Sequence, residues 1–152
     1  MHLEAFISLI IFVSWVYWIV ALISTWAFYR QKDEIDPAFS PPVSVLKPIK
    51  GFDYEAYLNL KSFFTQDYPQ YEILFGVETP EEPTLPVIKR LMEEHPQVPV
   101  KIIVAEPQSA NRKAGMLEIL SQHASYPIIV ASDSDFRVPP DYLRQVVSPL
   151  KK

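Results

Sequence analysis

The segment Pro-Ile-Ile-Val-Ala-Ser-Asp-Ser-Asp occupies residues 127–135 and joins an apolar run to two carboxylates. Its apolar run is typical of a strand that is buried on both faces of a parallel sheet. Asp133 and Asp135 then lie just beyond the carboxyl end of the strand, where open α/β sheets bind their ligands. Oxygen-only ligands suit a hard cation such as Mg²⁺ or Mn²⁺, and such a cation suits a diphosphate. The segment therefore indicates transfer from a nucleotide-diphosphate donor.

Strand and helix patterns alternate along the sequence that precedes and follows this segment. Apolar runs predict strands at 43–47, 71–78, 100–105 and 127–132. Helical apolar stripes predict helices at 54–66, 84–95, 113–124 and 140–147. This alternation predicts an α/β fold with a mostly parallel sheet and helices on both faces. The loops that follow the strands should then gather along one edge of the sheet.

The amino-terminal part of the chain predicts a membrane segment. Residues 5–29 contain no charged side chain, and as a helix they would be about 37 Å long, enough to cross a hydrocarbon core. A cleaved signal peptide fits poorly, because no Lys or Arg precedes the run. Arg30 and Lys32 follow it, which predicts a single-pass signal anchor at 1–30, a linker at 31–42 and a soluble domain on the cytoplasmic side.

The composition of the chain excludes some kinds of chemistry and argues against one class of partner. The chain has no Cys, which excludes a disulfide framework and thiolate chemistry. Its formal charge of −4 argues against a nucleic-acid partner.

Several motifs in this order and spacing resemble a known family. They are Val-Ser-Val-Leu-Lys-Pro-Ile-Lys-Gly (43–51), Ser-Phe-Phe-Thr-Gln-Asp-Tyr-Pro (62–69), Tyr-Glu-Ile-Leu-Phe (71–75), Asn-Arg-Lys (111–113) and Ser-Asp-Ser-Asp-Phe-Arg-Val-Pro-Pro-Asp-Tyr-Leu (132–143). Together they resemble the N-terminal half of a GT-A glycosyltransferase domain of the ceramide glucosyltransferase family, including its bacterial relatives in hopanoid glycolipid synthesis. The resemblance implies a partial GT-A domain, Rossmann-like, at 43–152.

The resemblance also implies roles for individual residues. Asp133 matches the carboxylate at the nucleotide-sugar ribose and metal, and Asp135 matches the second carboxylate of the metal motif, which some members of the family lack. The loop at 48–51 would line the uridine pocket, and Lys113 would lie near the nucleotide or diphosphate. The expected metal ligands are thus Asp133 and Asp135, and the expected donor-binding residues are Pro48, Lys50, Gly51, Glu78, Thr79, Lys113 and Asp133.

The sequence departs from the family pattern in two places. The family usually has an Asp after the second strand that contacts uracil, and Thr79 occupies this position, with Glu78 and Glu81 nearby. Either a neighbouring Glu substitutes for that Asp, or donor binding is weaker. The family's general base and its Gln-x-x-Arg-Trp motif come later than residue 152, so we expect no catalytic residue here and interpret the chain as a truncated product or an N-terminal fragment.

These observations favour a membrane-anchored glycosyltransferase that transfers a hexosyl group from a UDP-sugar to a lipid such as ceramide or a hopanoid. The alternative is a catalytically inactive membrane-anchored fragment that binds nucleotide or a partner. A phosphohydrolase is less favoured, because its Asp-x-Asp pair usually follows the first strand and is followed two residues on by Thr or Val, where this chain has Arg137.

Simpler interpretations apply to several of these residues. The Asp133 and Asp135 pair could be a solvated turn, and Lys113 and Arg112 could be surface residues in a first helical turn. Glu78 could be a solvated strand end. Lys47 and Lys50 could be a phosphate-facing pair or solvated lysines, and their pattern alone favours solvated lysines. The aromatic residues Tyr54, Tyr57, Phe63 and Phe64 are predicted to belong to the core rather than to a lipid-binding surface.

Overall fold

The computed structural model describes residues 2–30, 36 and 38–151. The chain divides into two compact units, Met1–Glu34 and Ile35–Lys152. Residues 31–35 and 37 of the predicted linker lie outside the described residues. In the second unit, the end of this predicted linker packs against the α/β domain. The Tyr68 hydroxyl donates to the Pro41 carbonyl over 2.7 Å, and Phe39 contacts the hydrophobic core.

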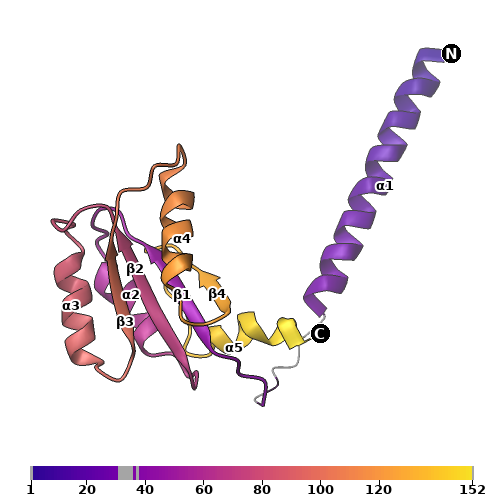
Figure 1. The fold of residues 1–152 in the computed structure, drawn as a ribbon. Coiled ribbons are helices and arrows are strands. Elements are labelled where there is room, and N and C mark those ends of the chain that lie inside the picture. Colours follow the sequence, from indigo (N-terminus) through magenta and orange to yellow (C-terminus); the bar gives the residue numbers. More distant parts are fainter. Residues whose placement is uncertain (1, 31–35, 37, 152) are drawn as a thin grey trace. The chain divides into compact units, whose positions relative to one another are not determined.

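The first unit contains the helix α1 (His2–Arg30), drawn in indigo in Figure 1. None of its described residues is buried within the chain. By length and composition this helix could cross a membrane. The Arg30 guanidinium lies 4.3 Å from the centre of the Trp26 ring, so a cation and an aromatic ring stand together at the helix end, as is common at membrane interfaces.

The sheet of the second unit has, among the described residues, four parallel strands: β1 (Val43–Pro48), β2 (Tyr71–Val77), β3 (Val100–Val104) and β4 (Ile128–Ala131). Their spatial order is β3-β2-β1-β4 (Figure 1). Val45 of the central strand β1 pairs with Ile73 of β2 on one side and with Val130 of β4 on the other. Because the strands run in one direction, their carboxyl ends meet at one edge of the sheet.

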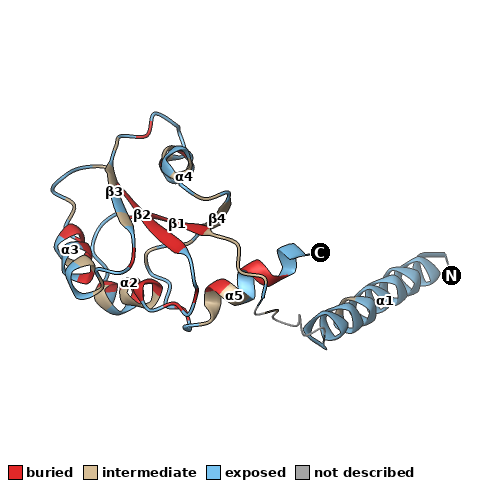
Figure 2. Cartoon of the chain, turned by 60° about the horizontal axis from the view of Figure 1, so that its bottom comes forward, coloured by how far each residue is buried: buried red, intermediate tan, exposed pale blue. Residues whose placement is uncertain are grey.

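Helices cover both faces of this sheet (Figure 2). The helices α2 (Ala56–Phe64), α3 (Leu85–Glu94) and α5 (Tyr142–Val147) lie on one face and α4 (Arg112–His123) on the other. Phe63 and Leu143 belong to the larger core on the first face, while Met116 and Leu120 of α4 pack on Leu46 and Leu74. A short 3-10 helix, η1 (Ser148–Lys151), follows α5. The predicted α/β class with a parallel sheet is confirmed.

The described elements differ from the predicted ones mainly at their ends, usually by one or two residues. One difference changes the role of a side chain: α2 begins at Ala56, and Tyr54 precedes it with 99% of its surface exposed. The prediction that Tyr54 belongs to the core is therefore wrong, because this residue lies in the turn before the helix. Phe63 and Phe64 are buried as predicted, and Tyr57 is partly buried against the same core.

Gly76 allows α4 to lie close to the sheet. A β-carbon at this position would come within 2.5 Å of the Met116 sulfur and 3.1 Å of a Leu120 methyl group. Both distances are shorter than ordinary van der Waals contacts. The absence of a side chain at Gly76 therefore lets α4, the helix that forms one wall of the pocket described below, pack closely on β2.

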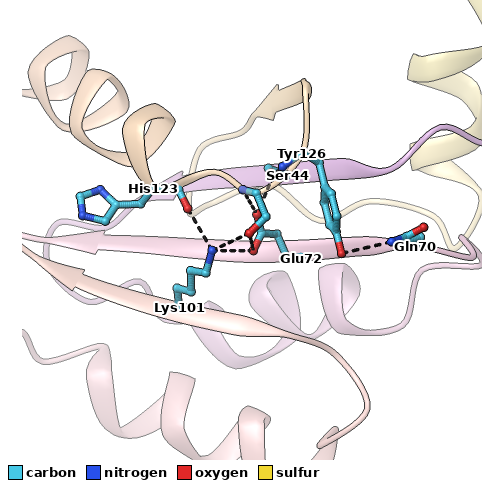
Figure 3. Close-up of polar contacts among 7 residues, drawn as sticks. Ser44, Gln70, Glu72, Lys101, His123 and Tyr126 are labelled. Carbon is cyan, nitrogen blue, oxygen red and sulfur yellow. Dashed lines mark hydrogen bonds and ion pairs between the residues drawn. The ribbon is translucent and has the colours of Figure 1, made fainter.

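A polar cluster around Glu72 closes the opposite, amino-terminal edge of the sheet (Figure 3). The buried Glu72 carboxylate accepts hydrogen bonds from the Ser44 hydroxyl at 2.7 Å and from the Ser125 backbone N–H at 2.5 Å. The Lys101 ammonium lies 3.0 Å from the same carboxylate and donates to the Ser125 hydroxyl. This amino-end cluster links β1, β2 and β3 to the segment that leads into β4.

Candidate functional site

A pocket of about 450 Å³ opens at the carboxyl edge of the sheet. Its walls come from the segment after β1, the end of β2, the first turns of α4 and the segment after β4. Six of the predicted site residues line it together with residues from the same segments. The lining residues are Pro48, Ile49, Lys50, Asp53, Glu78, Arg112, Lys113, Met116, Asp133, Ser134 and Asp135.

The two predicted metal ligands lie on the open side of this pocket. Asp133 and Asp135 are both exposed, and the side chain of Asp133 retains 50% of its accessible surface. The Lys113 ammonium lies 2.5 Å from an Asp133 carboxylate oxygen. Lys113 stands in the first turn of α4, whose start is fixed by Asn111, since its side chain accepts a hydrogen bond from the Ala114 N–H. The structure thus brings the predicted diphosphate lysine to the predicted metal carboxylate.

The segment after β4 is held to the body of the domain beyond the two carboxylates. The Ser62 hydroxyl accepts a hydrogen bond from the Val138 N–H at 3.2 Å. The Gln66 side chain donates to the Pro139 carbonyl and accepts from the Leu143 N–H. These contacts come from α2 and the residues that follow it, which explains how a helix distant in sequence sets the path of the acidic segment.

Lys47 lies beneath the acidic segment, and the prediction of a solvated side chain is wrong for this residue. It is fully buried, and its ammonium donates to the Asp133 carbonyl at 2.7 Å and the Ser132 hydroxyl at 3.3 Å. The nitrogen also lies 3.6 Å from the centre of the Phe63 ring. Burial lowers the pKa of Lys47 to about 7, although the negative charges of Asp133 and Asp135 raise it.

Glu78 and Arg112 form the opposite wall of the pocket. The Arg112 guanidinium donates two hydrogen bonds to the Glu78 carboxylate, at 2.9 and 2.8 Å. The hydrogen bond from Arg112 lowers the pKa of Glu78 below its ordinary value. Glu78 is therefore a fixed carboxylate rather than a freely solvated strand end.

Two predicted site residues do not line the pocket. Thr79, placed at the family's uracil-contacting position, and Gly51 are both absent from its walls. Gly51 has a φ of 77° and its carbonyl accepts a hydrogen bond from the Thr84 hydroxyl at 2.6 Å. Its part is to turn the chain after β1, because a positive φ is favourable for glycine. Of the two neighbours at the end of β2, Glu78 rather than Thr79 faces the pocket.

Sequence reasoning missed Asp53, Met116 and Ser134, and it left the role of Arg112 open. Asp53 carries no motif of its own, and only its place in the loop after β1 could have suggested it. Met116 fits a helical apolar stripe and also belongs to the core, so its contact with the pocket has no separate signal in the sequence.

Asp133 and Asp135 fit a hard divalent cation by their chemistry, since both offer carboxylate oxygens that are open to the pocket. Among residues 2–30, 36 and 38–151, no group of three or more His, Cys, Asp or Glu side chains could hold a metal ion. The two carboxylates would therefore need further oxygen ligands, which a diphosphate and water can supply.

The arrangement is similar to two solved structures. The mannosyltransferase PcManGT from Pyrobaculum calidifontis, solved with GDP-Man and Mn²⁺, has a TM-score of 0.68 and 22% identity, over 93% of this chain and 43% of that one. S. aureus TarS 1–349, solved with UDP, has a TM-score of 0.55 and 20% identity, over 72% of this chain and 32% of that one. The parallel sheet with its acidic carboxyl edge thus has the fold of the GT-A glycosyltransferases.

The sequence places the chain more narrowly within this class. The chain belongs to glycosyl transferase family 21, whose profile matches residues 6–152. Ceramide glucosyltransferase 1 of Caenorhabditis elegans is 37% identical in an alignment of 147 positions that covers 92% of this chain and 31% of that protein. Ceramide glucosyltransferase 3 of the same organism is 34% identical over 126 residues, 82% of this chain and 28% of that protein. The chain thus spans about a third of the length of these relatives.

Proposed function

We propose that this chain is the donor-binding part of a membrane-anchored glycosyltransferase. In this proposal the whole enzyme transfers a hexosyl group from a UDP-sugar to a lipid acceptor such as ceramide or a hopanoid. Residues 1–30 are the membrane anchor, 31–42 the linker and 43–152 the donor-binding half of the GT-A domain. The general base would activate the acceptor hydroxyl. We predict that it lies in the region of the family that follows the part matched by this chain.

The observation that carries the proposal is the mixed charge of the 450 Å³ pocket at the carboxyl edge of the sheet. Two exposed carboxylates, Asp133 and Asp135, share its walls with Lys50 and Lys113. A cation–diphosphate pair carries both signs of charge and would satisfy both groups of side chains. A pocket with carboxylates alone would favour a bare cation, and one with lysines alone would favour a free phosphate.

Each wall of the pocket has a part in this proposal. Asp133 and Asp135 would hold a divalent cation, Mg²⁺ or Mn²⁺, and Lys113 would move from Asp133 toward the diphosphate. Pro48 and Lys50, with the loop turned by Gly51, would line the uridine side together with Glu78. When bound, the cation would neutralise charge on the leaving diphosphate. The ammonium group of Lys113 would add positive charge beside the same oxygens.

The test is calorimetric titration of the full chain, in lipid nanodiscs, with UDP. We expect UDP to bind about 10- to 100-fold more tightly with Mn²⁺ present than with a chelator, a difference of about 1.4–2.8 kcal/mol. GDP and CDP serve as controls for the base, since Glu78 and the loop at 48–51 should favour uracil. Equal affinity for UDP with Mn²⁺ and with chelator would contradict the proposed site.

The proposed location is a membrane, with the α/β domain on the cytoplasmic side. The support is α1, which is long and apolar enough to span a bilayer, and the position of Arg30 at its end and of Lys32 after it. The two relatives described above are both called ceramide glucosyltransferases, which supports a lipid as acceptor.

A reporter enzyme or fluorescent protein fused after Lys152 would test this orientation. We expect a cytoplasmic signal, because basic residues that flank a membrane helix are retained on that side. A matched fusion in which Arg30 and Lys32 are replaced by Gln should show a weaker preference for one side. A fusion to the unaltered chain that reports from the far side of the membrane would be incompatible with the proposal.

A further inference from the structure

The side chain of Lys47 is the most unusual buried group in the described part of the domain. A lysine that is fully buried loses its hydration, so it requires polar partners inside the protein. Lys47 has two such partners, the Asp133 carbonyl at 2.7 Å and the Ser132 hydroxyl at 3.3 Å. Both belong to the segment that leads from β4 into the candidate site. The buried amine therefore contacts the acidic segment directly and has the face of Phe63 on another side.

These contacts begin where the hydrogen bonds of the sheet end. The last pair between β1 and β4 is Leu46 with Ala131, and the Ser132 N–H donates to the Leu46 carbonyl at 3.1 Å. Beyond this bond the chain leaves the sheet, and no strand pairing fixes residue 133. Lys47 follows Leu46 in β1, and its ammonium binds the carbonyl of Asp133, the next residue of the departing segment. It extends the attachment of this segment by one residue past the sheet.

The same segment is held again at residues 137 and 138. The Val138 N–H donates to the Ser62 hydroxyl at 3.2 Å, and the Arg137 side chain donates to the Asn59 side chain at 3.4 Å. Between these contacts and Lys47 lie the exposed side chains of Asp133 and Asp135. The acidic pair therefore lies on a short segment that is held by Lys47 at its start and by Ser62 and Asn59 at its end.

We infer that Lys47 is a positioning residue for the donor site: by binding the Asp133 carbonyl from below, it fixes the backbone from which the Asp133 and Asp135 carboxylates reach into the pocket. This inference rests on the proposed nucleotide-sugar site. A neutral amine has two N–H donors and an ammonium has three, so either form supplies both hydrogen bonds. Lys47 does not line the pocket itself, and it acts through the segment above it.

The test compares Lys47→Met with Lys101→Met in the full chain in nanodiscs. Methionine keeps the length and apolar contacts of lysine but cannot donate a hydrogen bond. Lys101 binds the buried Glu72 at the amino edge of the sheet, so its replacement disturbs another polar cluster far from the pocket. Two measurements are made on each variant: hydrogen exchange of the backbone amides of residues 132–136, and the Kd for UDP in the presence of Mn²⁺.

In Lys47→Met, we expect the amides of residues 132–136 to exchange about tenfold faster and the Kd for UDP to rise about tenfold, as loss of one or two hydrogen bonds implies. In Lys101→Met, faster exchange should be confined to the residues around Ser125, with an unchanged Kd. Unchanged exchange at 132–136 in Lys47→Met, or a Kd like that of Lys101→Met, would overturn the inference. If the unaltered chain does not bind UDP, the proposed function fails, and the exchange comparison alone decides the part of Lys47.

A second variant covers the case in which Lys47→Met does not fold. Ser132→Ala leaves the buried lysine in place, removes one of its two acceptors and removes the hydrogen bond from the Ser132 hydroxyl to the Asp133 carbonyl. Faster exchange confined to residues 132–136 in this variant would support the positioning role. Exchange identical to that of the unaltered chain would contradict it, because this variant removes both hydrogen bonds of the Ser132 hydroxyl at this attachment, the one from Lys47 and the one to the Asp133 carbonyl.

Discussion

Replacing Asp133 with alanine is expected to lower the affinity for UDP in Mn²⁺ to the value that the unaltered chain shows with a chelator, a loss of about 10- to 100-fold. Asp133 supplies a carboxylate that faces the pocket, and hard cations depend on such charged oxygen ligands. The substitution also removes the partner of the Lys113 ammonium, which lies 2.5 Å away. Calorimetric titration with Mn²⁺ and with chelator measures the loss directly.

Asp135→Ala and Asp141→Ala provide the matched comparison. Asp135 lines the same pocket, and we expect a smaller loss, because the family to which the chain belongs is expected to vary at this position. Asp141 lies outside the pocket, where its carboxylate accepts a hydrogen bond from Gln145, so its replacement should leave UDP binding unchanged. If Asp133→Ala bound UDP with Mn²⁺ as tightly as Asp141→Ala, these carboxylates would have no part in metal-dependent binding.

Replacing Glu72 with glutamine is expected to reduce the free energy of unfolding of the α/β domain by about 2–3 kcal/mol. The carboxylate accepts hydrogen bonds from Ser44, from the backbone and side chain of Ser125, and from Lys101. A glutamine offers one oxygen and turns an NH₂ group toward donors, and hydrogen bonds to a charged partner contribute about 1.5–3 kcal/mol. Pulse proteolysis in urea would measure the loss. Glu94→Gln changes an exposed carboxylate and should have little effect.

The contribution of Glu72 should also depend on pH. Burial raises the pKa of this carboxyl group, but the hydrogen bonds from Ser44, Ser125 and Lys101 outweigh burial and lower it below the ordinary value of 4.5. The folded protein therefore ionises Glu72 more readily than the unfolded chain does, so its stabilisation is complete above pH 4.5 and is lost as the pH falls through the folded pKa. The difference in unfolding free energy between the unaltered chain and Glu72→Gln should shrink over that range. A constant difference would show that the charge of Glu72 is not what stabilises the cluster.

Local patterns in the sequence were sufficient for the fold and for the position of the acidic pair. The strands were recognisable because each is a short apolar run, and their alternation with helical stripes implied parallel pairing. Parallel strands bring their carboxyl ends to one edge, so Asp133, Lys113 and Lys50 were expected to meet, and all three line one pocket. The long apolar run at the amino terminus was also recognisable as a membrane segment, because residues 5–29 contain no charged side chain.

The interior of the site depended on contacts between residues distant in sequence. Lys47 lies near the end of the apolar strand β1 and has the side chain of a surface residue, yet Ser132 and Asp133 from the segment after β4 and the ring of Phe63 from α2 enclose it. Tyr54 has the side chain of a core residue, yet it lies in the turn before α2 and is exposed. Nothing within a few residues of either position indicates these environments.

The sequence by itself determined which segments form strands and helices, and that two carboxylates follow the fourth strand, because periodicity and strand ends are properties of neighbouring residues. Only the tertiary structure decided that Lys47 supports Asp133 from below, that Glu78 pairs with Arg112, and that Glu72 joins the strands at the opposite edge. Each of these contacts joins residues separated by at least 28 positions in the chain. Burial and pairing of such charged groups depend on which partners the folded chain brings within hydrogen-bonding distance, and a single segment does not carry that information.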